Sequence, residues 1–136
     1  VSAIAICDML DRAPDQSMAD LKRALPKTWG SPTMSPHCPD DKKYAVVDRI
    51  IARIQAMADN GDQLIGQPIR SVVTVNGVRV TVEDGTWGLI RASSNKPGLV
   101  VVVESPATEA NKKAMFDALD AMLAEEPDVG EYDQKI

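Results

Sequence analysis

Hydrophobic residues recur at helical intervals in two stretches of this chain. In residues 40–59 they fall on one helix face, at Val47, Ile50, Ile51, Ile54 and Ala58. Asp40 and Asp41 suit the positive start of that helix, and Asn60-Gly61 favours its end. A second stripe follows Thr108, a suitable N-cap, and comprises Met115, Phe116, Leu119, Met122 and Leu123. The pattern therefore predicts one helix over 40–59 and another from 108 to the residues before Pro127.

Between these helices, apolar and polar residues alternate as in half-buried strands. Two turn signals, Asn76-Gly77 and Asp84-Gly85, each favour a two-residue type I′ hairpin turn. That register pairs Val75 with Val78, Val73 with Val80, Val82 with Trp87 and Val80 with Leu89. It places seven apolar residues on one buried face: Val73, Val75, Val78, Val80, Val82, Trp87 and Leu89. A fourth strand over 99–104 is a run of valines, typical of a central strand.

These elements predict an α+β domain. We expect a four-stranded, mainly antiparallel sheet with two helices packed on one face, spanning about residues 38–126. Residues 128–136 lack any periodic pattern and are expected to form a loose tail.

The N-terminal third has a different character. Residues 1–13 are apolar on nearly every side of a helix, which is typical of a helix buried in a larger core. We therefore expect the chain to be a C-terminal piece of a longer protein. A capping box over Ser17–Asp20 predicts a short second helix, and four prolines in residues 26–39 predict a linker or hinge. The predicted units are residues 1–37, helices of a preceding domain plus the hinge, and residues 38–136.

Composition and charge narrow the classes of function. The 136 residues are 44% hydrophobic and 26% charged, with a net charge of −5, which argues against a nucleic-acid partner. No apolar run approaches the ~20 residues of a membrane span, and no secretory leader pattern is present. Cys7 and Cys38 lack metal-site or redox spacing, and His37 alone is too little for zinc. We expect a cytoplasmic protein with no membrane partner.

The candidate chemistry lies in a polar turn between two apolar strands, residues 91–98. Arg91 can pair with phosphate oxygens through two hydrogen bonds. Three further side chains, Ser93, Ser94 and Asn95, supply donors, and successive backbone N–H groups in such a turn can bind an anion. Lys96 adds a second positive charge. Two other interpretations stay open: Arg91 pairs with a nearby carboxylate in a solvated loop, or it hydrogen-bonds backbone carbonyls of the sheet.

The run over residues 84–97, DGTWGLIRASSNKP, resembles the C-terminal domain of the α-D-phosphohexomutases, the phosphomannomutase/phosphoglucomutase enzymes. The signature of that family is Gly-Val-Arg-Val, then Asp-Gly, an aromatic residue, and Arg-Ala/Pro-Ser-Asn/Gly-Thr-x-Pro. Upstream, the family's junction between third and fourth domains is matched by Leu25-Pro26, Ser31-Pro32 and Cys38–Lys42. The resemblance covers essentially the whole chain. It implies a fold like that of the TATA-box-binding protein.

The resemblance also implies a function. The family's four-domain enzymes move a phosphoryl group between the 1- and 6-hydroxyls of a hexose, using a phosphoserine and a Mg²⁺ held by an Asp-x-Asp-x-Asp loop. This sequence contains neither motif, so we expect no catalytic residue, metal site or cofactor in it, and no catalysis by this chain alone. The expected partners are the missing N-terminal domains and glucose or mannose 1- or 6-phosphate, including the bisphosphate intermediate.

The phosphate site implied by the family comprises Arg91, Ser93, Ser94, Asn95 and Lys96. This sequence departs from the signature at three of these positions: Ser94 replaces Asn or Gly, Asn95 replaces Thr, and Lys96 replaces an acidic or neutral residue. Two alternatives remain. One is a phosphoglucosamine mutase, whose branch more often has Arg-Pro-Ser-Gly-Thr in this turn. The other is an interaction module whose Val-rich sheet packs on a partner protein.

Overall fold

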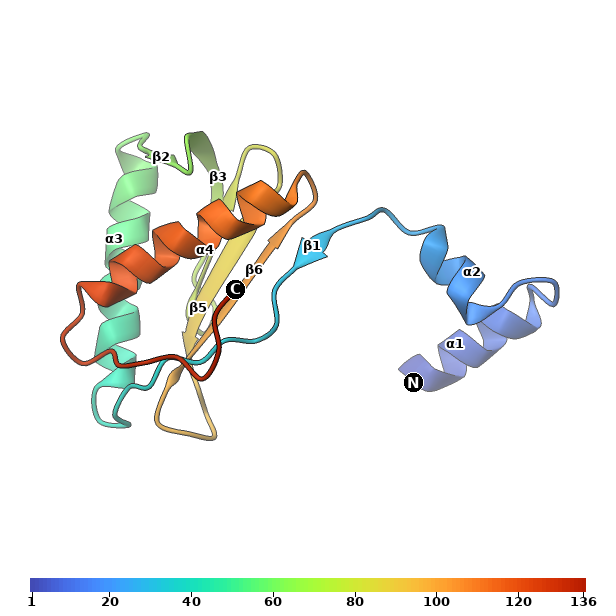
Figure 1. Cartoon of the computed structure of the whole chain (residues 1–136), viewed down its shortest axis with the longest axis horizontal. Helices are drawn as coiled ribbons and strands as arrows, with labels where there is room; N and C mark the ends of the chain where they lie inside the picture. The colour runs from blue at the N-terminus through green and yellow to red at the C-terminus, as the bar shows by residue number, and fades with distance from the viewer.

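A computed structural model describes all 136 residues, in four helices and six strands (Figure 1). The helices are α1 (Ser2–Asp11), α2 (Met18–Arg23), α3 (Lys43–Asp59) and α4 (Glu109–Ala124). The strands are β1 (Trp29–Gly30), β2 (Gln63–Leu64), β3 (Gln67–Val73), β4 (Val78–Val82), β5 (Trp87–Ala92) and β6 (Leu99–Ser105).

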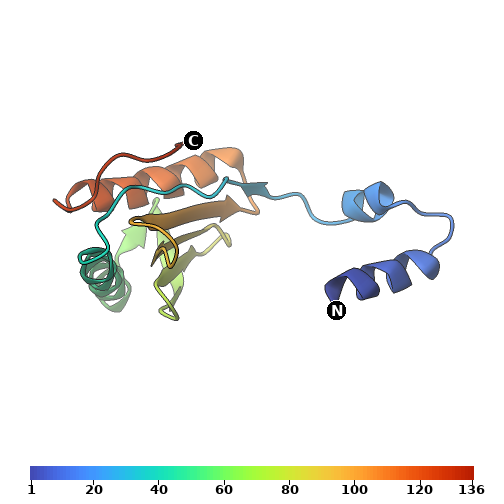
Figure 2. The same ribbon diagram turned by 90° about the horizontal axis from the view of Figure 1, so that it is seen from below.

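The strands form one sheet in the order β1-β6-β5-β4-β3-β2, and every neighbouring pair is antiparallel. Helices α3 and α4 lie on the same side of this sheet, which confirms the predicted α+β arrangement (Figure 2). The predicted number of four strands is wrong, because β1 and β2 extend the two edges. Strands of two residues are too short to show an alternating pattern. In addition, β1 lies among the prolines, which an edge strand tolerates.

The core fills the space between the helices and the sheet. Helix α3 begins at Lys43, later than predicted, because residues 39–42 form a turn in which the Pro39 carbonyl accepts hydrogen bonds from the N–H groups of Lys42 and Lys43. Gly61, with φ of +73°, follows the end of α3 as expected, and the Thr108 side chain caps α4. The largest fully buried side chains include Met34, Ile50, Ile54, Ile90, Leu99, Met115, Leu119 and Leu123.

Both predicted hairpin registers are wrong by one residue. Val73 lies opposite Arg79 instead of Val80, and Val80 lies opposite Gly88 instead of Leu89. The turn between β4 and β5 has three residues, 83–85, closed by a hydrogen bond from the Val82 N–H to the Thr86 carbonyl.

A register slip of one residue exchanges the two faces of a strand. Trp87 and Leu89 therefore leave the predicted buried face and lie half-buried on the face without helices, while Ile90 faces the core. Val73 and Val75, also predicted to be buried, are 50% and 83% exposed. The remaining members of the predicted face, Val78, Val80 and Val82, are buried as expected.

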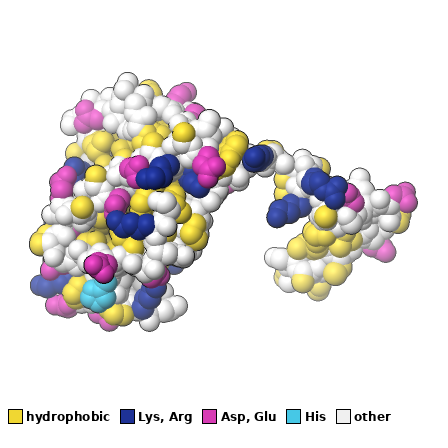
Figure 3. All heavy atoms as spheres, in the orientation of Figure 1, with side chains coloured by type: hydrophobic (Ala, Val, Ile, Leu, Met, Phe, Trp, Pro, Cys, Tyr) yellow, Lys and Arg dark blue, Asp and Glu magenta, His cyan; other side chains and the backbone are white.

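Helices α1 and α2 lie apart from the sheet, and none of their residues is buried (Figure 1). The predicted capping box at Ser17 and Asp20 opens α2. Apolar side chains lie together on the surface of α1 (Figure 3), and Ile4, Ile6 and Met9 of this helix are exposed, as is Val1 before it.

The proline-rich segment lies along the edge of the sheet from residue 29 to residue 38. Met34 and Val101 exchange two backbone hydrogen bonds, and the Leu99 N–H donates to the Pro36 carbonyl. We name residues 29–38 the entry segment, because the chain enters the sheet there.

The C-terminal residues are not the loose tail that the sequence predicts. The His37 N–H donates to the Glu131 carbonyl, and the Gly130 N–H donates to the His37 carbonyl. Val129, Tyr132 and Ile136 pack against the core. Contacts with the entry segment, distant in sequence, give these residues the order that their local pattern does not predict.

Candidate functional site

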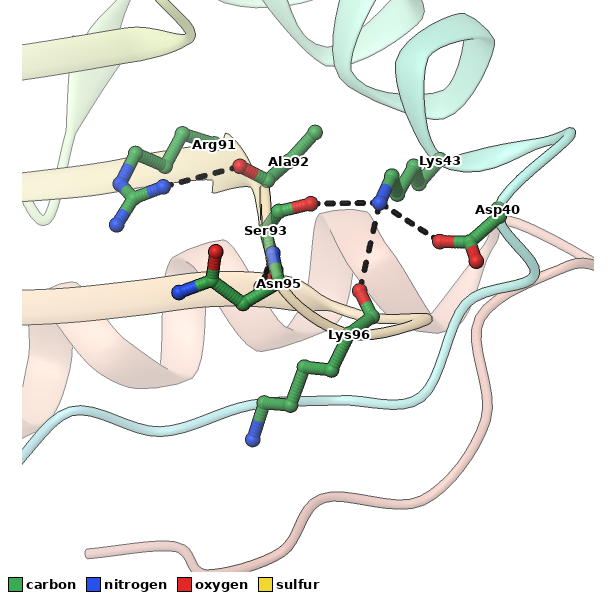
Figure 4. A network of polar contacts seen from close by, with 7 residues as sticks. All are labelled: Asp40, Lys43, Arg91, Ala92, Ser93, Asn95 and Lys96. Carbon is green, nitrogen blue, oxygen red and sulfur yellow. Dashed lines mark hydrogen bonds and ion pairs between the residues drawn. The ribbon is translucent and has the colours of Figure 1, made fainter.

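The predicted polar turn is a loop of residues 93–98 that joins β5 to β6 at one end of the sheet (Figure 4). The Ser93 N–H donates to the Gly98 carbonyl at 3.0 Å and closes the loop. The four residues between them, 94–97, are exposed. We name residues 91–98 the polar loop, because Arg91 and Ala92 lead directly into it.

Arg91 lies on β5 opposite Val100, on the sheet face without helices. Its Nη1 donates to the Ala92 carbonyl at 3.1 Å, and no carboxylate lies within 4.0 Å of its guanidinium. The interpretation in which Arg91 pairs with a carboxylate is therefore excluded. The interpretation in which it binds a backbone carbonyl holds for one of its five N–H donors. The other donors have no acceptor in the protein.

The loop serines and Asn95 have unequal access to solvent. Ser93 is 6% exposed, and its Oγ accepts the Asn95 N–H at 3.4 Å, so its hydroxyl shapes the loop. Ser94 and Asn95 are exposed at the loop tip, and the Ser94 N–H donates to no group of the protein. In Figure 4 the Asn95 amide and the Arg91 guanidinium lie on the same side of the loop.

Lys96 points away from these groups, toward the C-terminal residues (Figure 4). Its Nζ lies 3.3 Å from Asp133 Oδ2. The Ser35 N–H donates to Asp133 Oδ1 at 2.7 Å and lowers the pKa of the Asp133 carboxyl, and Lys96 lowers it further. The structure thus brings the Arg91 guanidinium and the Asn95 amide to one side of the loop and leaves Ser94 exposed at its tip, while Lys96 pairs with a carboxylate outside the loop.

The interior of the loop contains a charged residue that the sequence analysis missed. Lys43, the first residue of α3, is 5% exposed, and its Nζ lies 2.6 Å from the Ser93 carbonyl oxygen. It also donates to the Lys96 carbonyl at 3.4 Å and to Asp40 Oδ1 at 2.7 Å. The sequence contains a signal for this: Lys43 precedes Val47 by one helical turn and so continues the apolar stripe of α3. A lysine on such a stripe needs buried partners.

Together these groups suit an anion. Arg91 offers free guanidinium donors, and the loop tip offers the Ser94 N–H and the Asn95 side chain, with the Lys43 ammonium beneath them. No group of three or more His, Cys, Asp or Glu side chains in this chain is placed to hold a metal ion. None of its helices combines the length and apolar character that crossing a membrane requires.

Comparison with known proteins places these features in a family context. The family model described as "Phosphoglucomutase/phosphomannomutase, C-terminal domain" matches residues 37–122. This range contains α3, β2–β6, most of α4 and the whole polar loop.

Curated relatives agree with that match. A phosphomannomutase/phosphoglucomutase of Pseudomonas putida is 31% identical over 104 residues, which cover 76% of this chain and 20% of that protein. A phosphopentomutase of Thermococcus kodakarensis is 35% identical over 80 residues, covering 59% of this chain and 16% of the relative. A probable phosphoglucosamine mutase of Methanothermobacter thermautotrophicus is 31% identical over 72 residues, 53% of this chain and 14% of the relative. The chain thus spans a fifth or less of the length of these relatives.

A solved structure supports the fold. A phosphoglucomutase/phosphomannomutase family protein of Burkholderia thailandensis aligns with a TM-score of 0.59 and 23% identity. The alignment covers 81% of this chain and 20% of that one.

Proposed function

The chain belongs to the phosphoglucomutase/phosphomannomutase family and matches the C-terminal domain of that family, and we propose that it binds a hexose phosphate by the phosphate group that is not being transferred. One observation carries the proposal: Arg91, the next-to-last residue of β5, has free guanidinium donors and no carboxylate partner, and it precedes an exposed loop tip with a free N–H group. A guanidinium held in this way is suited to bind phosphate through two charge-assisted hydrogen bonds.

The role of such a site in an intact enzyme is positioning. Phosphoryl transfer needs in-line geometry between the attacking and leaving oxygens, and a held phosphate at the far end of the sugar supplies it. The substrate must present first one end and then the other to the reacting group. A site that recognises only phosphate serves both orientations.

The proposed substrates are glucose or mannose 1- and 6-phosphate and the bisphosphate intermediate, in an intramolecular phosphotransferase located in the cytoplasm. Phosphoserine chemistry and Mg²⁺ would belong to other domains of the same protein, and this chain alone is expected to be inactive. A phosphoglucosamine mutase is the alternative, in keeping with the names of two relatives. Ala92 stands where that branch more often has proline, which favours the first assignment.

The test is an NMR titration of this chain with glucose 1-phosphate, with glucose and sodium sulfate as controls. Charge-assisted hydrogen bonds contribute about 1.5–3 kcal/mol each, and the cost of association leaves an affinity of about 1 mM. We expect saturable amide shifts confined to residues 91–98 with the phosphate ester, and none with glucose. Self-association without any response to phosphate would instead favour an interaction module.

Arg91→Ala tests the central residue. It should weaken glucose 1-phosphate binding roughly tenfold or more, because a tenfold change corresponds to about 1.4 kcal/mol and one charge-assisted hydrogen bond contributes at least that much. Arg79→Ala is the matched control: it removes another arginine from the same sheet face, where Arg79 lies 4.3 Å from the Trp87 ring, outside the polar loop. Equal affinities for the Arg91→Ala variant and the unmodified chain would contradict the proposed function.

A further inference from the structure

Lys43 lies underneath the polar loop and has an acceptor for each of its three ammonium protons. These acceptors are the Ser93 carbonyl at 2.6 Å, the Lys96 carbonyl at 3.4 Å and Asp40 Oδ1 at 2.7 Å. The Lys43 side chain is 6% exposed, whereas the side chain of Asp40 is 68% exposed. A positive charge is thus held beneath the loop, while the carboxylate that pairs with it faces solvent (Figure 4).

The contact with Ser93 determines the direction of a neighbouring donor. In a trans peptide the carbonyl of one residue and the N–H of the next point in opposite directions. Because the Ser93 carbonyl points inward to Lys43, the Ser94 N–H must point away from it. That N–H has no acceptor in the protein. The inward lysine therefore aims a backbone donor outward from the loop tip.

The contact of Lys43 with the Lys96 carbonyl stabilises the loop but orients no further N–H donor. The Lys96 carbonyl precedes Pro97, which has no N–H, so this contact fixes the return of the loop only. The two carbonyls lie on either side of the exposed tip residues, Ser94 and Asn95. One ammonium group thus holds both ends of the segment that carries the tip.

A buried ammonium group is costly unless it is paired and hydrogen-bonded. A methionine at this position would fill similar space on the apolar stripe of α3 without that cost. The lysine is nevertheless placed where its charge lies behind free N–H donors. A phosphate dianion at the tip would be attracted by that charge and repelled by the charge of Asp40.

We propose that Lys43 is a positioning residue of the phosphate site. It orients the Ser94 N–H toward the ligand, and its buried charge strengthens phosphate binding, with Asp40 opposing it. This inference rests on the proposed function of the polar loop. It adds a residue from a different element, at the start of α3, to the residues of the loop itself.

The experiment compares three variants of the whole chain by thermal unfolding and by NMR titration with glucose 1-phosphate. Lys43→Met removes the charge and all three donors at similar volume. Lys42→Met is the matched control, because Lys42 is the neighbouring exposed lysine and contacts no loop carbonyl. Asp40→Asn keeps an oxygen that can accept from Lys43 and removes the opposing charge.

We expect Lys43→Met to weaken binding roughly tenfold and to abolish the ligand-induced shift of the Ser94 amide, while Lys42→Met binds like the unmodified chain. Asp40→Asn should bind about threefold more tightly at low salt, and the gain should shrink as salt screens the charge. A lysine that only stabilises the fold predicts unchanged affinity in Lys43→Met under conditions in which that variant is folded. If Lys43→Met fails to fold, Asp40→Asn still tests the proposal, because an unchanged affinity in that variant would overturn the opposing charge pair that the proposal requires.

The outcomes separate this inference from the proposed function. An unmodified chain that binds glucose 1-phosphate, together with unchanged affinity in both Lys43→Met and Asp40→Asn, overturns the role of Lys43 alone. An unmodified chain that does not respond to glucose 1-phosphate overturns the proposed function and this inference together.

Discussion

Gly77, in the turn between β3 and β4, lies directly against the strand that carries Arg91. Its φ is +113°, a backbone conformation that side chains disfavour. A Cβ at this position would clash with the Ile90 carbonyl oxygen and lie 2.6 Å from Arg91 Cβ. The glycine thus permits the close approach of the turn to the backbone of Arg91.

Gly77→Ala should therefore destabilise the fold and displace Arg91. The strain and the overlap together predict a loss of roughly 2–4 kcal/mol in the free energy of unfolding, with weaker phosphate binding. Gly61→Ala is the control, because Gly61 has φ of +73° but a Cβ added there would meet no atom within 4 Å. That variant should lose about 1 kcal/mol and keep its affinity. Urea unfolding measures the stability of the two variants, and the titration with glucose 1-phosphate measures their affinity. Equal losses in the two variants would refute the role of the contact between Gly77 and the backbone of Arg91.

For single residues, the sequence predicts a role only where the pattern of neighbouring residues indicates it. Arg91 and the polar residues after it are visible because they interrupt two apolar runs. The partner of Lys96 is not, since Asp133 lies 37 positions away and only the packing of the C-terminal residues brings it close. Lys43 is an intermediate case: its position on an apolar stripe signals burial, but its two carbonyl acceptors are 50 and 53 positions away.

At the scale of the elements, Asp84 connects the turn between β4 and β5 to two other parts of the fold. Its carboxylate accepts hydrogen bonds from the Thr86 N–H at 2.8 Å, from Gln67 Nε2 at 3.1 Å and from Asn111 Nδ2 at 2.7 Å. Burial raises the pKa of Asp84, but these hydrogen bonds outweigh it and bring the pKa below the ordinary value of 3.8. The ionised carboxylate therefore holds β3 and α4 to the turn.

This lowered pKa predicts a stability that depends on pH. A carboxyl whose pKa is lower in the folded state stabilises the fold above its unfolded pKa, and this stabilisation is lost as the pH falls through the folded pKa. The melting temperature should therefore fall between about pH 5 and pH 2. Asp84→Asn should melt lower at pH 7 and show a smaller fall with acid, whereas Asp15→Asn, an exposed control, should follow the unmodified chain. An unaltered acid dependence in Asp84→Asn would refute this assignment.

The same turn explains why the register between β4 and β5 could not be read from the sequence. Asp-Gly favours a two-residue turn by local preference, yet the turn closes with three residues. Gln67 of β3 donates through Nε2 to Asp84 Oδ2 and accepts the Asp84 N–H at its Oε1, and these contacts lie outside any local rule. The periodicity of the longer helices is a local property, and those helices were predicted within a few residues.

At the scale of the whole molecule, the entry segment belongs physically to the sheet domain. Met34 and Cys38 in this segment are fully buried, and the segment hydrogen-bonds with β6 along its length. Residues 24–28 lie between α2 and β1, outside any helix or strand. Any hinge motion proposed for the proline-rich segment is therefore best located there. The prolines predict a segment outside the helices, but nothing in the sequence shows that the backbone of this segment pairs with β6.

Truncation tests this arrangement. A chain of residues 29–136 should unfold at nearly the same temperature as the full chain, because no residue of α1 or α2 is buried. A chain of residues 39–136 loses β1 and the buried Met34 side chain and should be less stable by at least about 3 kcal/mol. Calorimetry of both chains measures the difference. If the two truncated chains proved equally stable, the entry segment would not be part of the domain.

The pairing between the entry segment and β6 also has a mechanical consequence. The Leu99 N–H donates to the Pro36 carbonyl and the Cys38 N–H donates to the Pro97 carbonyl, so the exit of the polar loop is fastened to the incoming chain. A force applied along that chain would load these antiparallel hydrogen bonds in shear, in which several must break at once. Tension from the N-terminal side would thus move the sheet and the polar loop together as one rigid body. The geometry around Arg91 would be preserved during that movement.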